Sequence, residues 1–355
     1  MKTKTFSILS LLALLWFGGV GVVFAQSRGL DLDIHGFSHI QYDVVRTDPT
    51  GGDSETTNGF TTGGIDFFVT SELSDSFHFL NETVLEFEEG GGTSVDVERV
   101  LLKYTYNEAL SISAGRGHTA LGYWNQRFHH GTWLQTTTDR PIIYLFEDDG
   151  GILPVHFVGL EFSGSIFDDQ ISYTANVANG RGSITDEVQQ VGDKNDSKMV
   201  SLMVEYEPEA LEGFGVGANI LFDRIPSDAA AGRPDQFDEL IYGAHLYYTE
   251  DPVEFLAEIQ FIDHSNSSDF SHWGAYIQAA YSFDNIKPYY RFDILDIESG
   301  DPFFTGLEGV EDQTQHTVGI RWDMTTYVAA KLEYRHLDAD SEDSDAGTLQ
   351  VSFAF

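Results

Sequence analysis

Residues 327–337 read YVAAKLEYRHL, and the last eight residues of the chain, 348–355, read TLQVSFAF. In both stretches apolar residues alternate with polar or charged ones. Because successive side chains of a β-strand point to opposite faces of the sheet, this period of two predicts strands with one apolar and one polar face. On the first strand the two faces carry Val328, Ala330, Leu332 and Tyr334 against Lys331, Glu333 and Arg335.

The same alternation continues along the chain from residue 32. Turn-forming residues separate the alternating segments, and the connections between segments are mostly short at one end and long at the other. This arrangement is typical of an antiparallel meander with two different ends. The sequence predicts sixteen strands, at residues 32–43, 63–73, 77–88, 95–106, 109–116, 154–163, 169–178, 197–206, 214–223, 237–249, 253–264, 270–283, 286–297, 314–323, 326–337 and 347–355.

A soluble β-sandwich would also alternate, but two features favour a membrane-spanning barrel. The strands are numerous and about ten residues long, and aromatic residues gather at one end of the apolar face, as a lipid headgroup boundary requires. We therefore predict an all-β fold, a closed antiparallel transmembrane β-barrel of sixteen strands. The outward aromatic residues are Tyr104, Tyr106, Phe162, Tyr206, Tyr248, Tyr281, Phe283, Trp322 and Phe355.

The N-terminus has the pattern of a secretory signal peptide. Lys2 and Lys4 precede an apolar stretch at 6–24, and Val23 and Ala25 stand at positions −3 and −1 of a cleavage site. An uncleaved membrane anchor is the alternative, which the acidic segment after residue 26 disfavours. We expect residues 1–25 to be removed and residues 26–355 to form a single barrel domain without a membrane helix.

The composition excludes several classes of function. The 355 residues include 57 Asp and Glu but only 19 Lys and Arg, so the formal charge is −38, and there is no cysteine. Nucleic-acid binding needs a basic face, and thiolate metal sites, disulfides and cysteine nucleophiles need cysteine. We therefore expect no nucleic-acid partner and no cysteine chemistry.

The leader, the sixteen segments, the long connection after the fifth strand and the C-terminal Phe355 together resemble the Gram-negative porin superfamily. The resemblance covers the whole mature chain. It implies a non-enzymatic, water-filled channel in the outer membrane of a Gram-negative bacterium, assembled as a homotrimer in contact with outer-membrane lipid. It also implies that the third long loop, residues 117–153, folds into the lumen as the constriction loop.

Charged residues in this loop and on the inward faces of the strands suggest how the constriction works. Our hypothesis is that an acidic run faces a basic group across the narrowest section, where the transverse field orders water and favours polar solutes. Net acidity predicts passive diffusion of small hydrophilic solutes and ions with a mild preference for cations. The acidic run is Glu147, Asp148 and Asp149, the basic group is Arg99, Arg291, Arg321, Lys331 and Arg335, and Lys103 and Arg127 also belong to the lining.

Two other functions remain open from the sequence. A substrate-specific channel, for sugars or for anions such as phosphate, would use Tyr123, Trp124, His129 and Trp133 of the loop as a binding lane. An outer-membrane enzyme is less favoured, because no nucleophile motif surrounds the serine and histidine residues at the strand ends, His264-Ser265 and Ser271-His272.

The sequence predicts no metal or cofactor site of defined geometry. The spacing of His118, His129 and His130 matches no closed zinc pattern. The oxygen-rich segment at 338–345 lacks the glycine and glutamate of an EF-hand loop, so we expect at most a weak divalent-cation site there. Its ligands would be Asp338, Asp340, Asp343 and Asp345.

Polar and small residues interrupt the outward apolar face of the first three strands at Gly36, Ser38, Asn81 and Thr83. Polar groups that face hydrocarbon are costly. We therefore predict that these strands face another subunit, in agreement with the trimer. A monomer that tolerates a few small polar residues is the alternative.

Overall fold

The computed structural model describes residues 31–87, 91–128, 131–146, 150–183, 191–229, 235–266, 268–305, 307 and 309–355. Leu32–Phe355 form one compact unit. The predicted signal peptide and its cleavage site lie outside the described residues. Within the described ranges no helix is both long and apolar enough to cross a bilayer.

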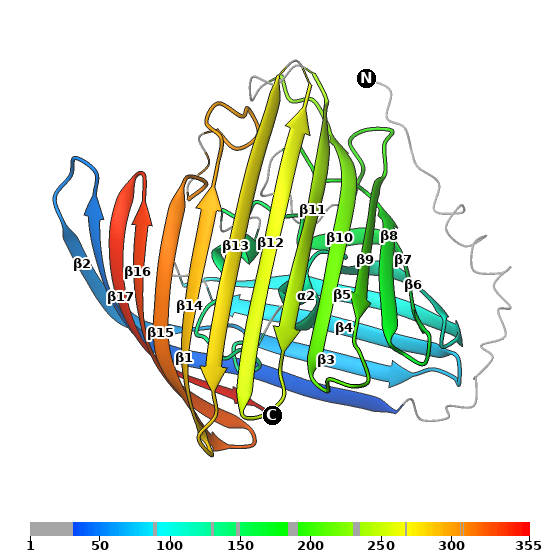
Figure 1. The fold of residues 1–355 in the computed structure, drawn as a ribbon, viewed down its shortest axis with the longest axis horizontal. Coiled ribbons are helices and arrows are strands. Elements are labelled where there is room, and N and C mark those ends of the chain that lie inside the picture. Colours follow the sequence, from blue (N-terminus) through cyan, green and yellow to red (C-terminus); the bar gives the residue numbers. More distant parts are fainter. Residues whose placement is uncertain are drawn as a thin grey trace, which may run out of the picture. The chain divides into compact units, whose positions relative to one another are not determined.

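Seventeen antiparallel strands form one sheet that closes on itself, because the last strand pairs with the first (Figure 1). The elements are β1 (Leu32–Pro49), β2 (Glu55–Thr62), β3 (Ile65–Glu72), β4 (Phe77–Phe87), β5 (Thr93–Asn107), β6 (Leu110–His118), α2 (Tyr123–Arg127), η1 (Ile142–Tyr144), β7 (His156–Ile166), β8 (Ile171–Ala178), β9 (Met199–Tyr206), β10 (Phe214–Ile225), β11 (Phe237–Tyr248), β12 (Val253–Ser265), β13 (Asp269–Tyr281), β14 (Ile286–Asp296), β15 (Gln313–Thr325), β16 (Val328–Ala339) and β17 (Glu342–Ala354).

The barrel wall nevertheless has sixteen positions, because β2 and β3 share one. β1 pairs with β17 along one edge, and along the other edge with β3 near its start and with β2 further on. Gly63 and Gly64 separate β2 from β3, and a Cβ atom on Gly63 would lie 1.8 Å from the His39 ring. The predicted sixteen-stranded barrel is confirmed, but residues 44–62 and 338–346, expected as loops, are mostly strand.

The two faces of the strands follow the predicted alternation. Outward aromatic side chains are exposed, for example Tyr106 at 69%, Phe283 at 62% and Phe355 at 59%. Inward charged side chains such as Glu258 and Arg291 are buried inside the barrel. The outer face is therefore apolar and the inner face is polar, as a membrane barrel requires.

A close approach between β5 and β6 generates the first prediction. Gly115 has φ +141°, and a Cβ atom there would lie 1.9 Å from the carbonyl oxygen of Val100. Gly115→Ala should therefore cost about 3 kcal/mol through backbone strain and overpacking, measured by urea unfolding of the refolded barrel. Gly347→Ala is the control, since nothing lies within 4 Å of its Cβ position. Equal stability of the two variants would contradict the close approach.

Candidate channel and inward loop

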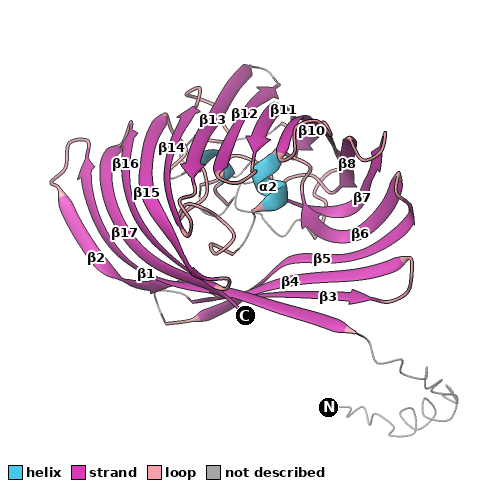
Figure 2. Ribbon diagram, turned by 60° about the horizontal axis from the view of Figure 1, so that its bottom comes forward, coloured by secondary structure: helices cyan, strands magenta, loops and turns pink. Residues whose placement is uncertain are grey.

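The described residues of the segment between β6 and β7, 119–128, 131–146 and 150–155, lie inside the barrel, and we call them the inward loop. Its short helix α2 lies between opposite walls of strands (Figure 2). Large apolar side chains of the loop, including Leu121, Trp124 and Ile143, are almost fully buried. They pack against inward residues of β9–β14, and each such burial contributes roughly 1.5–3 kcal/mol. The predicted inward folding is therefore observed, and apolar burial favours it.

Glu258 on β12 holds the start of α2. Its carboxylate accepts hydrogen bonds from the backbone N–H groups of Tyr123 (2.7 Å) and Trp124 (2.8 Å). It also accepts from the hydroxyls of Tyr144 (2.8 Å) and Tyr276 (2.6 Å). N–H groups in the first turn of a helix have no partner within the helix, so the carboxylate satisfies them. Burial and the Glu258 charge raise the pKa of Tyr144 well above its ordinary value, so this hydroxyl remains a donor.

Basic side chains of β14–β16 hold the backbone of the loop. The Arg291 guanidinium donates to the carbonyls of Asp139 (2.8 Å) and Arg140 (3.0 Å). Lys331 Nζ donates to the carbonyls of Thr132 (2.5 Å) and Thr137 (2.7 Å). Arg291 and Lys331 are at most 1% exposed. They are therefore anchors for the loop rather than charges on an open pore.

Arg321 and Arg335 also contact the loop. Arg321 Nη1 donates to the carbonyls of Trp133 (2.7 Å) and Gln135 (2.6 Å), and Arg335 forms an ion pair with Asp139. The basic group predicted on these strands thus meets the loop, where its partners among the described residues are backbone carbonyls, the Thr137 hydroxyl and Asp139. On the strands themselves, its members pair with Asp293, Asp323 and Glu333. The predicted acidic partners Glu147, Asp148 and Asp149 lie outside the described residues.

Open space remains beside the inward loop, mainly along the wall of β1 and β3–β6, and it also borders Glu161 of β7 and residues of β15 and β16. Three adjoining cavities lie there, with volumes of about 530, 430 and 320 Å³. The smallest, which we call the waist, shares Arg99, His118 and Gln126 with the largest and Phe37 with the other. A passage past the loop would therefore follow this wall, away from the Arg291 and Lys331 anchors.

Charges along these cavities are nearly balanced, although acidic residues outnumber basic ones threefold in the whole chain. At the waist, Arg99 forms an ion pair with Glu82 at 2.5 Å and lies over the Phe68 ring at 5.3 Å. Among the residues that the structure describes, the lining comprises seven carboxylates, Asp33, Asp66, Glu72, Glu82, Glu86, Asp139 and Glu161, and five basic side chains, Arg99, Lys103, Arg127, Arg140 and Arg335.

The residues predicted as a substrate lane fall into different environments. Tyr123 stacks on Tyr247 with ring centroids 4.2 Å apart, and burial raises the pKa of Tyr123 to about 12. Trp124 is 1% exposed, so both side chains pack the loop against the wall. Trp133 stacks on Phe37 of the waist at 6.1 Å, while His129 lies outside the described residues.

The four aspartates proposed for a weak cation site form no three-ligand group in the part of the chain that the structure describes. Asp338 lies opposite Asp343 in the β16–β17 hairpin. Asp345 accepts from Tyr334 (2.6 Å) and contacts His336 (2.9 Å). Among the described residues, a group with metal-ligand geometry occurs elsewhere, at His264, His272 and Asp301.

Comparisons with known proteins identify the fold. No known family and no curated protein matches the sequence. The structure is similar to Salmonella typhi OmpF in complex with daunomycin (TM-score 0.61, 18% identity, 92% of this chain and 98% of that one). It is also similar to the anion-selective porin of Comamonas acidovorans (0.62, 13%, 92% and 100%) and to Pseudomonas putida OprB (0.57, 9%, 91% and 94%). The chain therefore has the fold of the sixteen-stranded outer-membrane porins.

Sequence reasoning placed Glu258 and Glu333 on the inward face but missed their roles as anchors. Glu333 accepts from the Thr138 backbone N–H (2.9 Å) and the Tyr289 hydroxyl (2.8 Å). One signal was available for Glu258, because its immediate inward neighbours on β12, Leu256 and Gln260, are uncharged. A carboxylate between uncharged inward neighbours indicates a specific partner.

Removing the Glu258 charge tests the anchor. Glu258→Gln replaces one acceptor oxygen by an amide donor that faces other donors, so we expect a loss of roughly 3–5 kcal/mol of stability. Release of the loop should also raise the single-channel conductance in planar bilayers. Glu250→Gln, at an exposed turn, is the matched control. Wild-type conductance and stability of Glu258→Gln would contradict the anchor.

Proposed function

We propose that the protein is an outer-membrane porin for passive diffusion of small hydrophilic solutes and ions. The observation that carries this proposal is the row of charged cavities between the inward loop and the β1–β6 wall, inside a barrel with an apolar outer face. Water-filled passages of this kind select by diameter and lining charge. Outer-membrane lipid would contact the exposed aromatic and aliphatic residues.

We further propose a homotrimer that packs through β1–β4. Asn81 and Thr83 lie on the outward face of β4, where Thr83 donates to Asn81 at 3.1 Å. Such a polar pair is costly against hydrocarbon but acceptable against another subunit. A structure of Vibrio cholerae OmpT described as a trimer form has a similar fold (TM-score 0.56, 13% identity, 92% of this chain and 99% of that one). Light scattering in detergent with one chain per particle would contradict the trimer.

Liposome swelling with sugars of graded size tests passive diffusion. We expect swelling rates to fall smoothly as the sugar grows, without saturation, because the passage selects by size. A rate that saturates with one solute at low concentration would instead favour a substrate-specific channel. Absence of any conductance in planar bilayers would contradict a channel altogether.

The lining charge supports a mild preference for cations, because carboxylates outnumber basic groups in the three cavities. Anion passage is the second candidate. One observation favours it: at the waist Arg99 is paired with Glu82, and Arg127 adds a second guanidinium, which lies 3.8 Å from the Glu207 carboxylate. Reversal potentials in a salt gradient distinguish the two candidates by their sign.

Two lysines with different surroundings test which charges set selectivity. Lys103 lines the largest cavity, so Lys103→Gln should shift the reversal potential toward cations without loss of stability. Lys331 is buried against the loop, so Lys331→Met should leave selectivity unchanged but cost about 1–3 kcal/mol through unpaired carbonyls. A larger selectivity change in Lys331→Met than in Lys103→Gln would overturn this assignment.

A further inference from the structure

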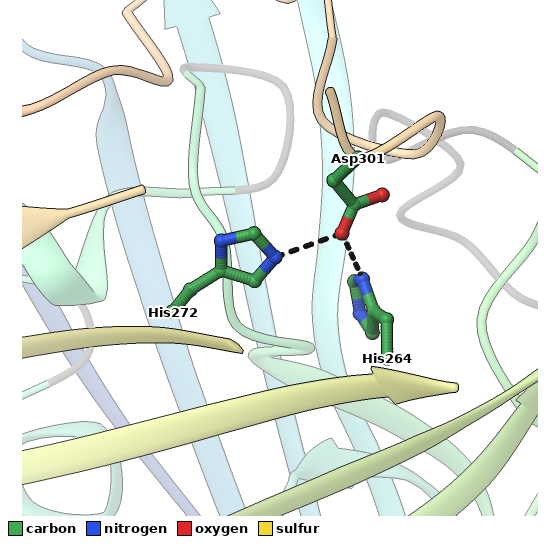
Figure 3. Close-up of side chains that lie close together, drawn as sticks. All are labelled: His264, His272 and Asp301. Atoms are coloured by element: carbon green, nitrogen blue, oxygen red, sulfur yellow. Dashed lines mark hydrogen bonds and ion pairs between the residues drawn. The ribbon is translucent and has the colours of Figure 1, made fainter. Parts of the chain in front are cut away.

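Three side chains from two parts of the chain converge at the long-loop end of the barrel (Figure 3). His264 lies near the end of β12, His272 near the start of β13, and Asp301 in the connection between β14 and β15. Asp301 Oδ2 lies 2.5 Å from His264 Nδ1 and 2.8 Å from His272 Nε2. All three residues are at most 2% exposed.

Neighbouring groups orient each of the three side chains. His264 Nε2 lies 2.9 Å from Glu239 Oε2, and Asp301 Oδ1 accepts the Phe303 N–H at 2.7 Å. The Glu298 N–H donates to His272 Nδ1 at 3.1 Å. A carboxylate on the far nitrogen of a histidine is the arrangement that supports metal ligation by the near one. His264 has this arrangement, with Nδ1 turned toward Asp301.

The surroundings favour a cation. Asp301 and Glu239 are buried carboxylates, and Arg181 pairs with Glu239 at 2.8 Å. His264 lies between them, at hydrogen-bond distance from both carboxylates. Positive charge at this position can come from a proton on His264 or from a metal ion.

We propose that His264 Nδ1, His272 Nε2 and Asp301 Oδ2 bind a divalent transition metal, with Zn²⁺ as the ion of choice and water in the fourth position. Two imidazole nitrogens and a carboxylate oxygen form a ligand set suited to zinc. The three ligand atoms lie within 4.8 Å of one another. Tetrahedral zinc with bonds of about 2.0–2.1 Å needs them about 3.3 Å apart, so the hydrogen-bonded atoms must separate by less than about 1 Å.

Metal binding changes the protonation of His264 and His272. His264 loses its Nδ1 proton to solvent and keeps its Nε2 proton, which it donates in a hydrogen bond to Glu239. The ring proton of His272 moves from Nε2 to Nδ1. The backbone N–H of Glu298, which otherwise donates to Nδ1, must then turn away. Because Glu298 is exposed, this segment can adjust, but the lost hydrogen bond lowers the affinity. We expect micromolar rather than nanomolar binding, which weakens as the pH falls because one proton is released.

The experiment uses the purified, detergent-solubilised barrel after removal of metals by chelation. Titration with Co²⁺ should give the intense visible bands of a tetrahedral site, and Zn²⁺ should displace Co²⁺ at one equivalent per chain. Asp301→Asn and His272→Gln should each weaken Zn²⁺ binding by about tenfold or more. Heat-dependent gel migration checks that each variant retains the folded barrel.

His336→Gln is the matched control, because His336 also contacts an aspartate, Asp345 at 2.9 Å, but belongs to no three-ligand group among the described residues. This control should bind Zn²⁺ like the unmodified protein. Lack of saturable binding below about 1 mM Zn²⁺, or equal binding by folded Asp301→Asn, would overturn the proposal and leave a protonated His264 as the balancing charge. The readout is independent of conductance, so its failure leaves the proposed channel untouched.

Discussion

The arrangement of the lumen depends on hydrogen-bond partners for the backbone of the inward loop, which is buried inside the barrel. Each carbonyl or N–H group that the inward loop buries without a partner would cost about 1–3 kcal/mol. Arg291 and Lys331 donate to loop carbonyls, and Glu258 accepts from loop N–H groups. These charges are themselves expensive to bury, so the wall and the loop stabilise each other. The anchors and the loop should therefore be regarded as one unit.

This anchoring decides where solvent can pass. Apolar residues of the inward loop fill the space next to β9–β14, and the basic anchors extend the contact to β16. A barrel of sixteen strands is too wide to be filled by side chains alone, so the opposite side stays open. The Arg99–Glu82 pair and Phe37 thus line the remaining cavity because of contacts made on the other wall.

Strands and their faces could be predicted because they depend on local patterns, whereas the inward folding of the loop was implied by the resemblance to porins. The alternation predicted sixteen wall positions, and it placed Arg291 and Lys331 on the inward face of their strands. Alternation cannot say what an inward side chain contacts, so both residues were assigned to an open pore. The convergence of Asp301 with His264 and His272 was also unpredictable, since it depends on how a long connection folds back over a hairpin. Residues 55–62 were missed because their threonines and Asn58 resemble a loop.

The same reasoning limits what net charge says about selectivity. A formal charge of −38 suggests a strongly negative channel, yet the described residues of the cavity lining include seven carboxylates and five basic groups. Most acidic residues lie elsewhere, many of them in exposed turns and hairpins, where salt screens them within about 10 Å. In the proposed channel, a permeating ion would respond mainly to the charges of the waist, which include Arg99, Glu82 and Arg127. Selectivity would then depend on the position of the few lining charges rather than on the net charge of the chain.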